Sequence, residues 1–424
     1  MGRHYEIVSC LYRLLGAKVG KRVFWPGHLP LFSGEFDLLE IGDDVVFGSR
    51  SAIFCTTVDS CEKVVLCAGS NLSDNSIVLP GGVLGKNSVL GSNSICPAGW
   101  YLPEGSTWVG GRACQPVLLD KGVEPDFVVP KLSSEVKQEK LQFRGDATTL
   151  RPFGKAFYLR DAPYYVFPLR FIISYSFACK IFAVSFHTLP LLAALHGAAG
   201  FFYGYPINER EYAGIYIPPV ILFSTILCYF FFTNILRVML WLAIELAGKW
   251  MIMGRRKVGQ YDYDKCDYAQ RWELYQLLGK IRSIGRVNLL GFFAGTPLMN
   301  QIVRWQGGKI GKGCCLYPTG GDPYMPEPDL VELGDYTVVD KASIVCHLNT
   351  GGHFNLAKII TEDHVTLRSR SRIQQGVYVE SGAMLLEKSL ALTGEVIDSD
   401  SIWQGAPATR VLGYPSQSRA YQNV

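Results

Sequence analysis

A six-residue repeat runs through two separate stretches of this chain and limits its fold more than any other feature. In the first stretch every sixth residue is apolar and the fifth residue of each hexad is small, as in LGKNSV and LGSNSI (84–95). An apolar side chain every six residues fills a narrow three-sided prism, and a small residue suits its tight corner. The pattern predicts a left-handed parallel β-helix, whose inward positions are Ile41, Phe47, Ile53, Leu66, Leu72, Val78, Leu84 and Leu90.

The second stretch shows the same period nearer the C-terminus. Its inward positions are expected at Leu333, Val339, Val345, Thr361, Leu367, Ile373, Val379, Leu385 and Ala391, and its small positions include Thr337, Ser343, Ser371, Ala383 and Ser389. The first repeat steps thirteen residues between 53 and 66, and the second steps sixteen between 345 and 361. We therefore expect a loop in each β-helix, three residues longer in the second.

The two repeats belong to an internal duplication. Residues 11–23 match 302–314, 35–44 match 327–336, and 106–113 match 401–408. The second unit follows a long lead (272–299), whereas the first has almost none. This difference predicts that the chain begins in mid-unit and that an upstream unit lies on another chain or in a longer gene product.

Two long apolar runs separate the repeats. Residues 181–203 and 212–236 contain no Asp, Glu, Lys or Arg, and each is long enough to cross roughly 30 Å of hydrocarbon. Nine basic residues flank the pair and one, Arg210, lies in the link. Cytosolic flanks are enriched in Lys and Arg, so we expect a multi-pass protein with both β-helix domains in the cytosol.

Three ionisable residues interrupt the apolar pattern in and beside these runs, namely Lys180, His187 and Glu245. An ionisable group within a membrane is a functional candidate by default. A transporter built on this hairpin is therefore one hypothesis. Because two spans per chain form a pore only when chains associate, that transporter would be an oligomer.

These features predict a membrane protein in which a transmembrane α-helical hairpin joins two left-handed parallel β-helix (hexapeptide-repeat) domains. Its parts are a first β-helix with an N-terminal amphipathic helix (1–130), a linker (131–165), the transmembrane hairpin (166–250), an amphipathic and interfacial lead (251–300) and a second β-helix (301–424). A net charge of +4 without long basic runs argues against nucleic acid as a partner. The six-residue spacing of Cys55, Cys61 and Cys67 follows the repeat, so no metal site is expected.

The loop that differs between the two units is the candidate catalytic site. FCTTVDS (54–60) in the first corresponds to VCHLNTGGHFNL (345–356) in the second. His347 thus replaces Thr56, and the longer loop adds Asn349 and His353. A histidine suits a general base near neutral pH. The alternative is that His347 is an ordinary solvated corner residue. A zinc site like that of β-helical carbonic anhydrases fits poorly, because five residues separate His347 from His353.

The C-terminal motifs resemble known families. WQGAPATRV (403–411) resembles the Gly-x-Pro-Ala closure of hexapeptide acyltransferases. HLNTGGHF (347–354), with residues 389–407, looks like the C-terminal region of fungal-type nonribosomal-peptide-synthetase-like proteins, and is similar to the membrane-embedded end of poly-lysine synthetases. The resemblance implies tandem acyltransferase-like domains between transmembrane pairs, forming amide bonds from building blocks on a carrier domain. His347 and Asn349 match that family's His-Leu-Asn element, while His353 falls where its pattern is loose.

The resulting prediction is a membrane-bound acyl- or aminoacyl-transferase that forms amide or ester bonds. His347 would be the base and Asn349 a positioning or oxyanion-side group, with His353 as a further candidate. The donor would be acyl-CoA or a phosphopantetheine-carrier thioester, with no bound cofactor. Expected partners are the lipid bilayer, a carrier protein or synthetase, and an oligomer or third β-helix unit. The alternatives are a non-catalytic scaffold subunit of a synthetase assembly and the oligomeric transporter.

Overall fold

The chain forms two compact units. The computed structural model describes residues 7–25, 31–32, 34–112, 115–120, 156, 159–203, 219–279, 283–284, 287–320, 325–350 and 353–412. The first unit combines Met1–Pro168, Arg255–Gln270 and Phe293–Val424, and the second combines Leu169–Gly254 and Arg271–Phe292. Most of the predicted linker (131–165) lies outside the described residues.

The N-terminal half of the first unit is a three-faced parallel β-helix. One face is β1 (Lys18–Val19), β3 (Leu39–Ile41), β6 (Val64–Leu66), β9 (Val83–Leu84) and β12 (Tyr101–Leu102). The second is β4 (Val46–Phe47), β7 (Asn71–Leu72), β10 (Val89–Leu90), β13 (Thr107–Arg112) and the antiparallel β14 (Gln115–Asp120). The third is β2 (Leu31–Phe32), β5 (Ala52–Ile53), β8 (Ile77–Val78) and β11 (Ile95–Cys96).

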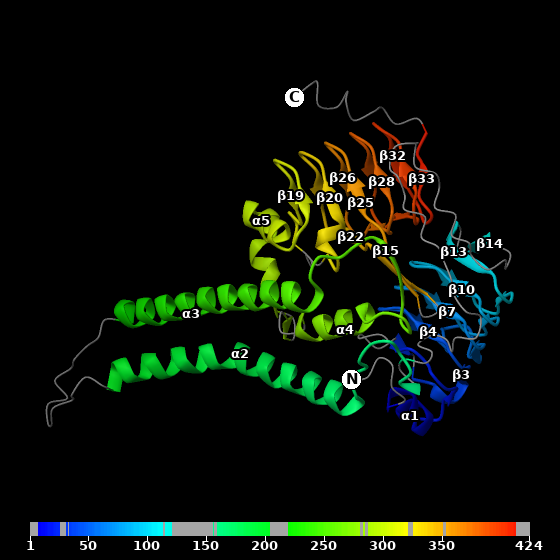
Figure 1. The fold of residues 1–424 in the computed structure, drawn as a ribbon, viewed down its shortest axis with the longest axis horizontal. Helices are drawn as coiled ribbons and strands as arrows, with labels where there is room; N and C mark the ends of the chain where they lie inside the picture. Colours follow the sequence, from blue (N-terminus) through cyan, green and yellow to red (C-terminus); the bar gives the residue numbers. More distant parts are fainter. Residues whose placement is uncertain are drawn as a thin grey trace. The chain divides into compact units, whose positions relative to one another are not determined.

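The C-terminal half repeats this architecture, and Figure 1 shows its strands stacked as successive rungs. One face is β18 (Lys309–Ile310), β20 (Val331–Leu333), β25 (Ile359–Thr361), β28 (Tyr378–Val379) and β31 (Val396–Ile397). The next is β19 (Cys315–Leu316), β21 (Val338–Val339), β26 (Thr366–Leu367), β29 (Met384–Leu385), β32 (Ile402–Gln404) and the antiparallel β33 (Thr409–Arg410). The third is β22 (Ser343–Ile344), β27 (Arg372–Ile373) and β30 (Leu390–Ala391).

The six-residue period places the apolar core as predicted. Leu66 pairs with Leu84 and Leu84 with Leu102, so equivalent residues of neighbouring coils are eighteen positions apart. Leu72, Val78, Leu84 and Leu90 have no exposed surface. Removing such side chains from water contributes about 1.5–3 kcal/mol each, so one inward residue per hexad supplies a continuous core.

One predicted inward position is wrong by one residue. The strand pairing joins Ile344, not Val345, to Ile373. The small position of that coil is accordingly Ala342 rather than Ser343, and Ala342 is buried. Because Ile344 corresponds to Ile53, the step across the loop to Thr361 is seventeen residues against thirteen in the first β-helix, and the loop is four residues longer, not three.

The tight corners also differ from the prediction in detail. The fourth residue of a hexad, not the fifth, adopts positive φ, as at Gly69 (72°) and Asn75 (58°). Gly and Asn tolerate this conformation best. The small fifth residue is buried beside the corner, where the Ser76 hydroxyl donates to the Ser73 carbonyl at 2.8 Å. The fifth position is therefore small because it lies inside the bend.

Short helices precede both β-helices at equivalent positions. Helix α1 (Ile7–Leu14) has Val8 and Tyr12 buried, and α5 (Pro297–Trp305) is its counterpart. Each helix has an arginine in its last turn that bonds the first coil. Arg13 donates to the Gly20 carbonyl at 2.6 Å, and Arg304 donates to the Gly311 carbonyl at 2.9 Å. Single 3₁₀ turns, η1 (Phe36–Leu38) and η6 (Pro328–Leu330), also recur.

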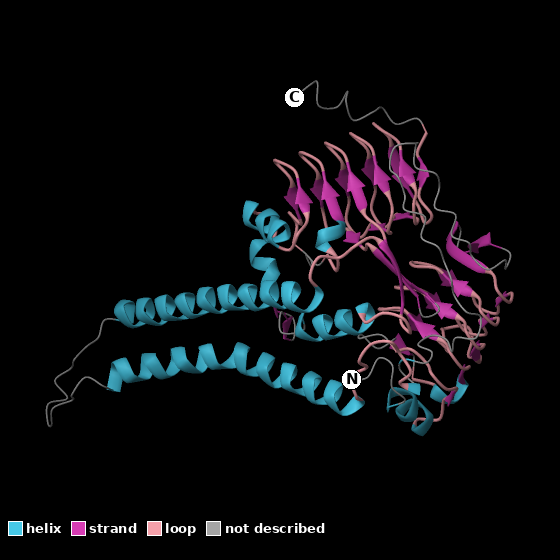
Figure 2. Ribbon diagram, in the orientation of Figure 1, coloured by secondary structure: helices cyan, strands magenta, loops and turns pink. Residues whose placement is uncertain are grey.

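The second unit is built on two long helices that lie side by side in Figures 1 and 2, α2 (Leu169–Tyr203) and α3 (Pro219–Gly248). Helix α3 continues into a π-helical turn, η3 (Lys249–Met253). The unit also contains most of α4 (Tyr268–Gly279), the hairpin of β16 (Ser283–Ile284) and β17 (Val287–Asn288), and η5 (Leu289–Phe293). Two helical stretches, Leu169–Phe186 and Thr225–Met253, are long and apolar enough to cross a membrane.

The polar residues of these helices have different surroundings. Glu245 is buried and accepts a hydrogen bond from the Tyr275 hydroxyl at 2.6 Å. The Lys180 side chain is exposed, and that of His187 lies outside the described residues. The transporter hypothesis needs these groups to face one another, and Glu245 is instead bonded to a tyrosine of α4.

An ion pair joins the two β-helices within the first unit. The guanidinium of Arg372, in β27, bonds the carboxylate of Asp74, which follows β7. Asp74 also accepts a hydrogen bond from Arg50 at 2.5 Å. The Asp74 and Arg372 side chains are only 13% and 10% exposed, so this is a nearly buried contact between residues 298 positions apart.

We predict that Asp74→Ala lowers the free energy of unfolding by about 3–5 kcal/mol, because it leaves the Arg372 charge buried without its carboxylate. Glu387→Ala is the matched control, since Glu387 pairs with Arg368 and both side chains are 47% exposed. Urea titration followed by tryptophan fluorescence measures both variants. Equal losses in the two variants would show that the Asp74 pair does not hold the β-helices together.

Candidate active site

The loop that carries the predicted site residues is a β-hairpin that leaves the second β-helix. Its strands are β23 (His347–Thr350) and β24 (His353–Leu356), and it departs just after β22 and returns at β25. β24 pairs on its other side with β15 (Gly259–Asp262). The hairpin therefore belongs to a three-stranded antiparallel sheet, in which β24 is the central strand and β23 an edge strand.

The strand register separates the predicted residues. In an antiparallel pair, directly opposed side chains share a face and neighbours along a strand alternate. His347 lies opposite Leu356 and Asn349 lies opposite Phe354, so these residues share one face. His353 lies on the other face, opposite Asp262, with 4.0 Å between its Nδ1 and the Asp262 Oδ2. The structure thus brings His347 and Asn349 together and turns His353 away from them.

A buried carboxylate orients His347. Glu327 Oε1 lies 2.8 Å from His347 Nδ1, and Glu327 Oε2 accepts the Cys346 backbone N–H at 3.2 Å. An ionised carboxylate only accepts hydrogen bonds, so a Glu327 carboxylate that is ionised requires the proton of this bond to be on Nδ1. The neutral imidazole then presents a lone pair on Nε2, which is the form that a general base requires.

The environment fixes the imidazole without sealing it. The Glu327 side chain has no exposed surface, whereas the His347 side chain is 20% exposed. The His347 ring stacks on the Phe354 ring, with centroids 4.9 Å apart and planes at 23°. Phe354 itself is fully buried. The histidine is thus held by the Glu327 carboxylate and the Phe354 ring while part of its side chain remains exposed.

The cysteine beside His347 does not suit a nucleophile. Cys346 is buried, and burial followed by the nearby Glu327 charge raises the pKa of its thiol. Thiolate is the reactive form of cysteine. The arrangement favours proton abstraction by His347 from a substrate over covalent catalysis by Cys346.

The first β-helix keeps part of this arrangement without the base. By the internal match, Glu35, Asp37 and Cys55 correspond to Glu327, Asp329 and Cys346. Thr56 stands where His347 does, and its hydroxyl donates to the Cys61 sulfur at 3.1 Å. Glu35 is half-buried and Asp37 is exposed, unlike their buried counterparts. The general-base geometry is therefore present in the second β-helix and not in the equivalent loop of the first.

Sequence reasoning missed Glu327. A signal for it existed, because the matched segments 35–44 and 327–336 both begin with Glu one coil before the loop that carries position 56 or 347. The six-residue frame could not reveal the contact, since the glutamate precedes the first strand of its coil.

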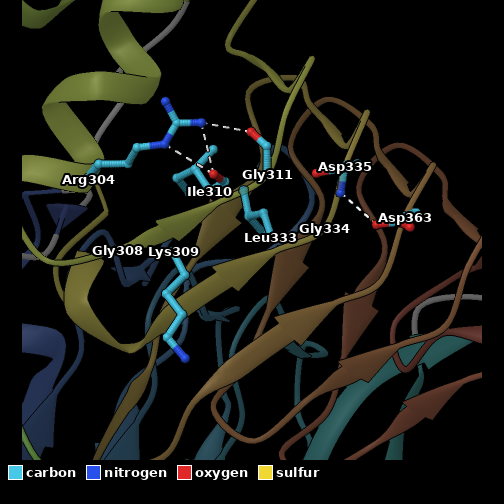
Figure 3. A pocket seen from close by; sticks show the side chains of 9 residues that line it. All are labelled: Arg304, Gly308, Lys309, Ile310, Gly311, Leu333, Gly334, Asp335 and Asp363. Atoms are coloured by element: carbon cyan, nitrogen blue, oxygen red, sulfur yellow. Dashed lines mark hydrogen bonds between the residues drawn. The ribbon is translucent and has the colours of Figure 1, made fainter.

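A surface depression of about 460 Å³ lies elsewhere in the second β-helix, and Figure 3 shows it. Two of its charged side chains bond to the backbone, and a third, Lys309, pairs with the Glu332 carboxylate at 3.2 Å. The Arg304 guanidinium donates to the Ile310 and Gly311 carbonyls, and the Asp363 carboxylate accepts the Asp335 N–H at 2.7 Å. None of the predicted site residues lines it; the lining residues are Arg304, Gly308, Lys309, Ile310, Gly311, Leu333, Gly334, Asp335 and Asp363.

Comparison with solved structures gives distant likenesses that cover less than half of the chain. A hexapeptide-repeat acetyltransferase of Vibrio cholerae is 16% identical, with a TM-score of 0.22, over 27% of this chain and 78% of its own. A maltose O-acetyltransferase of Clostridium difficile 630 is 10% identical, with a TM-score of 0.23, over 39% of this chain and 98% of its own. Because these scores are low, the β-helix assignment depends on the strand pairing itself.

Comparison with characterised sequences gives a match over almost the whole chain. No known family model matches the sequence. The delta-poly-L-ornithine synthetase of Acinetobacter baumannii (strain AB307-0294) is 23% identical over 418 residues, which is 94% of this chain. The chain spans only 26% of that synthetase's length. The chain is thus similar to about a quarter of a delta-poly-L-ornithine synthetase.

Proposed function

We propose that this chain is an acyl- or aminoacyl-transferase whose base is His347. The observation that carries the proposal is the buried Glu327 carboxylate 2.8 Å from Nδ1 of His347, whose side chain is 20% exposed. A solvated corner histidine needs no such partner. In a non-catalytic scaffold, burying a carboxylate beside a histidine would lower stability through desolvation of the charge and would serve no reaction.

The reaction follows from the chemistry of the dyad. His347 Nε2 takes a proton from an amine or hydroxyl acceptor as that group attacks a thioester carbonyl. A C–N or C–O bond forms, the C–S bond breaks, and the departing thiolate takes up the proton that His347 received. The imidazolium formed in between is stabilised by the Glu327 carboxylate, since opposite charges within a few ångströms favour the charged form. Asn349, on the same face, would position the acceptor or donate to the developing oxyanion.

The synthetase relative supports the aminoacyl version of this proposal. Its name describes synthesis of poly-L-ornithine linked at the delta position. Such a polymer grows when an amine attacks an activated amino-acid carbonyl, which is the step assigned above to His347. The donor would be a thioester on a phosphopantetheine carrier, or acyl-CoA, delivered by a synthetase partner. The likeness to fungal-type nonribosomal-peptide-synthetase-like proteins remains a prediction.

We further propose that the helical unit spans a membrane as a hairpin. Along α2 and α3 large apolar side chains are exposed, and lipid would cover them; they include Phe171, Phe177, Ile181, Val184, Leu189, Phe223, Leu227, Phe231, Ile235 and Met239. The two left-handed β-helices, which precede and follow the hairpin in the sequence, would then both face the cytosol. A third β-helix unit or an oligomer would complete the assembly, since related hexapeptide proteins place their sites between prisms.

We predict that His347→Ala lowers kcat by about 10²–10⁴, the usual loss for a general base. The assay uses an ornithyl thioester on a pantetheine carrier with free L-ornithine, and mass spectrometry detects the product. His353→Ala is the matched control, because it removes the same side chain from the other face of the same hairpin and should cost far less. A folded His347→Ala protein that keeps full activity would leave the scaffold function as the better one.

We predict that both β-helices are reached from the cytosolic side. Cysteines are introduced at the exposed residues Asp59 and Glu387, in a protein whose exposed Cys10 and Cys61 are changed to serine. A membrane-impermeant maleimide should label both positions in inside-out vesicles, while Asn208→Cys in the link should be labelled only in right-side-out vesicles. Opposite labelling of residues 59 and 387 would contradict a hairpin.

A further inference from the structure

The Glu327 carboxylate poses an electrostatic problem that its nearest partners do not solve. Its side chain has no exposed surface, and neither the Cys346 N–H nor a neutral His347 imidazole, the form that a general base requires, brings a positive charge to it. A carboxylate buried without a compensating cation gains a proton rather than remain charged. A protonated Glu327 would donate to Nδ1, and His347 would then carry its proton on Nε2 and be useless as a base.

A buried cation, the guanidinium of Arg256, lies beside the turn that follows Glu327. Its side chain and that of Asp329 have no exposed surface, and Nη1 lies 2.8 Å from Asp329 Oδ1. The Arg256 backbone N–H also donates to Asp329 Oδ2 at 2.7 Å. Asp329 lies two residues after Glu327, in η6, so these two bonds hold the turn that carries Glu327.

Charge as well as geometry links Arg256 to Glu327. Burial acts to lower the pKa of Arg256, but Tyr268, Asp329 and Glu327 together raise it above its ordinary value. Burial likewise raises the pKa of Tyr268, against the opposing effect of the Arg256 charge. Arg256 therefore stays a cation inside a cluster that contains the Glu327 carboxylate.

The internal duplication provides a natural comparison. In the first β-helix the equivalent Asp37 is exposed, so water can stabilise its charge, and Glu35 is half-buried with one carboxylate oxygen, Oε2, covered. In the second β-helix both carboxylates are buried, and the buried arginine accompanies them. Burial of the acidic pair and provision of a cation thus occur together, in the copy that also holds the histidine.

We propose that Arg256 is a positioning residue that keeps Glu327 ionised and thereby holds His347 as the Nδ1–H tautomer. The inference deepens the proposed function, on which its catalytic meaning rests, and Arg256 itself touches no reacting atom. The residue lies three positions after the last residue of η3, in the segment that continues into β15 and completes the sheet of the site.

The test reads the tautomer directly, in the full-length detergent-solubilised protein without substrate. Two-bond ¹H–¹⁵N spectra of histidine-labelled protein at pH 8 distinguish Nδ1–H from Nε2–H, and His347→Gln assigns the signal among the seven histidines. We expect Nδ1–H in the wild type. Arg256→Met and the more polar Arg256→Gln should both convert His347 to Nε2–H, because Glu327 becomes protonated.

Two further variants separate charge from structure. Arg256→Lys keeps the positive charge and should keep Nδ1–H. Arg255→Met, which removes the exposed neighbouring arginine, should leave the spectrum unchanged. A folded Arg256→Met or Arg256→Gln protein with Nδ1–H intact would overturn the inference, as would Nε2–H in Arg256→Lys.

The outcome is independent of the proposed reaction. If His347→Ala keeps full activity, the transferase assignment fails, while the tautomer still decides whether Arg256 controls the dyad. If the tautomer fails to change in the neutral Arg256 variants while His347→Ala is inactive, the base assignment stands and the role of Arg256 is refuted.

Discussion

The stacking of eighteen-residue coils is the constraint on which the rest of the first unit depends. Each coil closes its own interior only because the coils before and after it cover its inward residues, such as Leu84 between Leu66 and Leu102. The backbone donors of the flat faces are used by the parallel ladders. Extra residues can therefore be inserted only at corners, where the backbone is not hydrogen-bonded into a parallel sheet. The candidate site obeys this limit, because its hairpin leaves the corner after β22 and changes no neighbouring rung.

The two β-helices show how one scaffold supports two different corners. Both copies retain a glutamate, an aspartate and a cysteine around the same corner. The second copy adds four residues there, and this length lets the chain form a hairpin that meets β15. His347 of this hairpin contacts Glu327, and the segment that supplies β15 also supplies Arg256, which bonds Asp329. Length, burial and charge compensation at this corner are thus parts of one arrangement.

The sequence predicted the features that depend on local periodicity and missed the contacts between residues that are distant in the sequence. The inward residues and the apolar helices could be read directly, because their spacing repeats every six residues or their charge is absent over a long run. The six-residue frame predicted Val345 as the inward residue, but the inward residue is Ile344. The coil is one residue shorter there, and counting in sixes cannot detect a missing residue. Glu327 and Arg256 could not be found by counting. Glu327 meets His347 through the closure of a coil, and Arg256 bonds Asp329 from a segment 73 residues away that has no periodic pattern. The sheet likewise separates His347 from His353, although the sequence places them in one short loop.

The position of β24 in the middle of its sheet has a consequence for the strand register on which the site depends. Side chains alternate between faces along a strand, so a one-residue slip of β23 against β24 would turn His347 to the side that His353 now occupies. Two-stranded hairpins tolerate such slips, but β15 holds β24 from its other edge through four paired residues. The buried Phe354 ring adds a second restraint, since it fits beneath the imidazole only in this alignment. The register of the sheet therefore fixes the orientation of the His347 side chain. It also decides which of the two histidines of the hairpin meets Glu327.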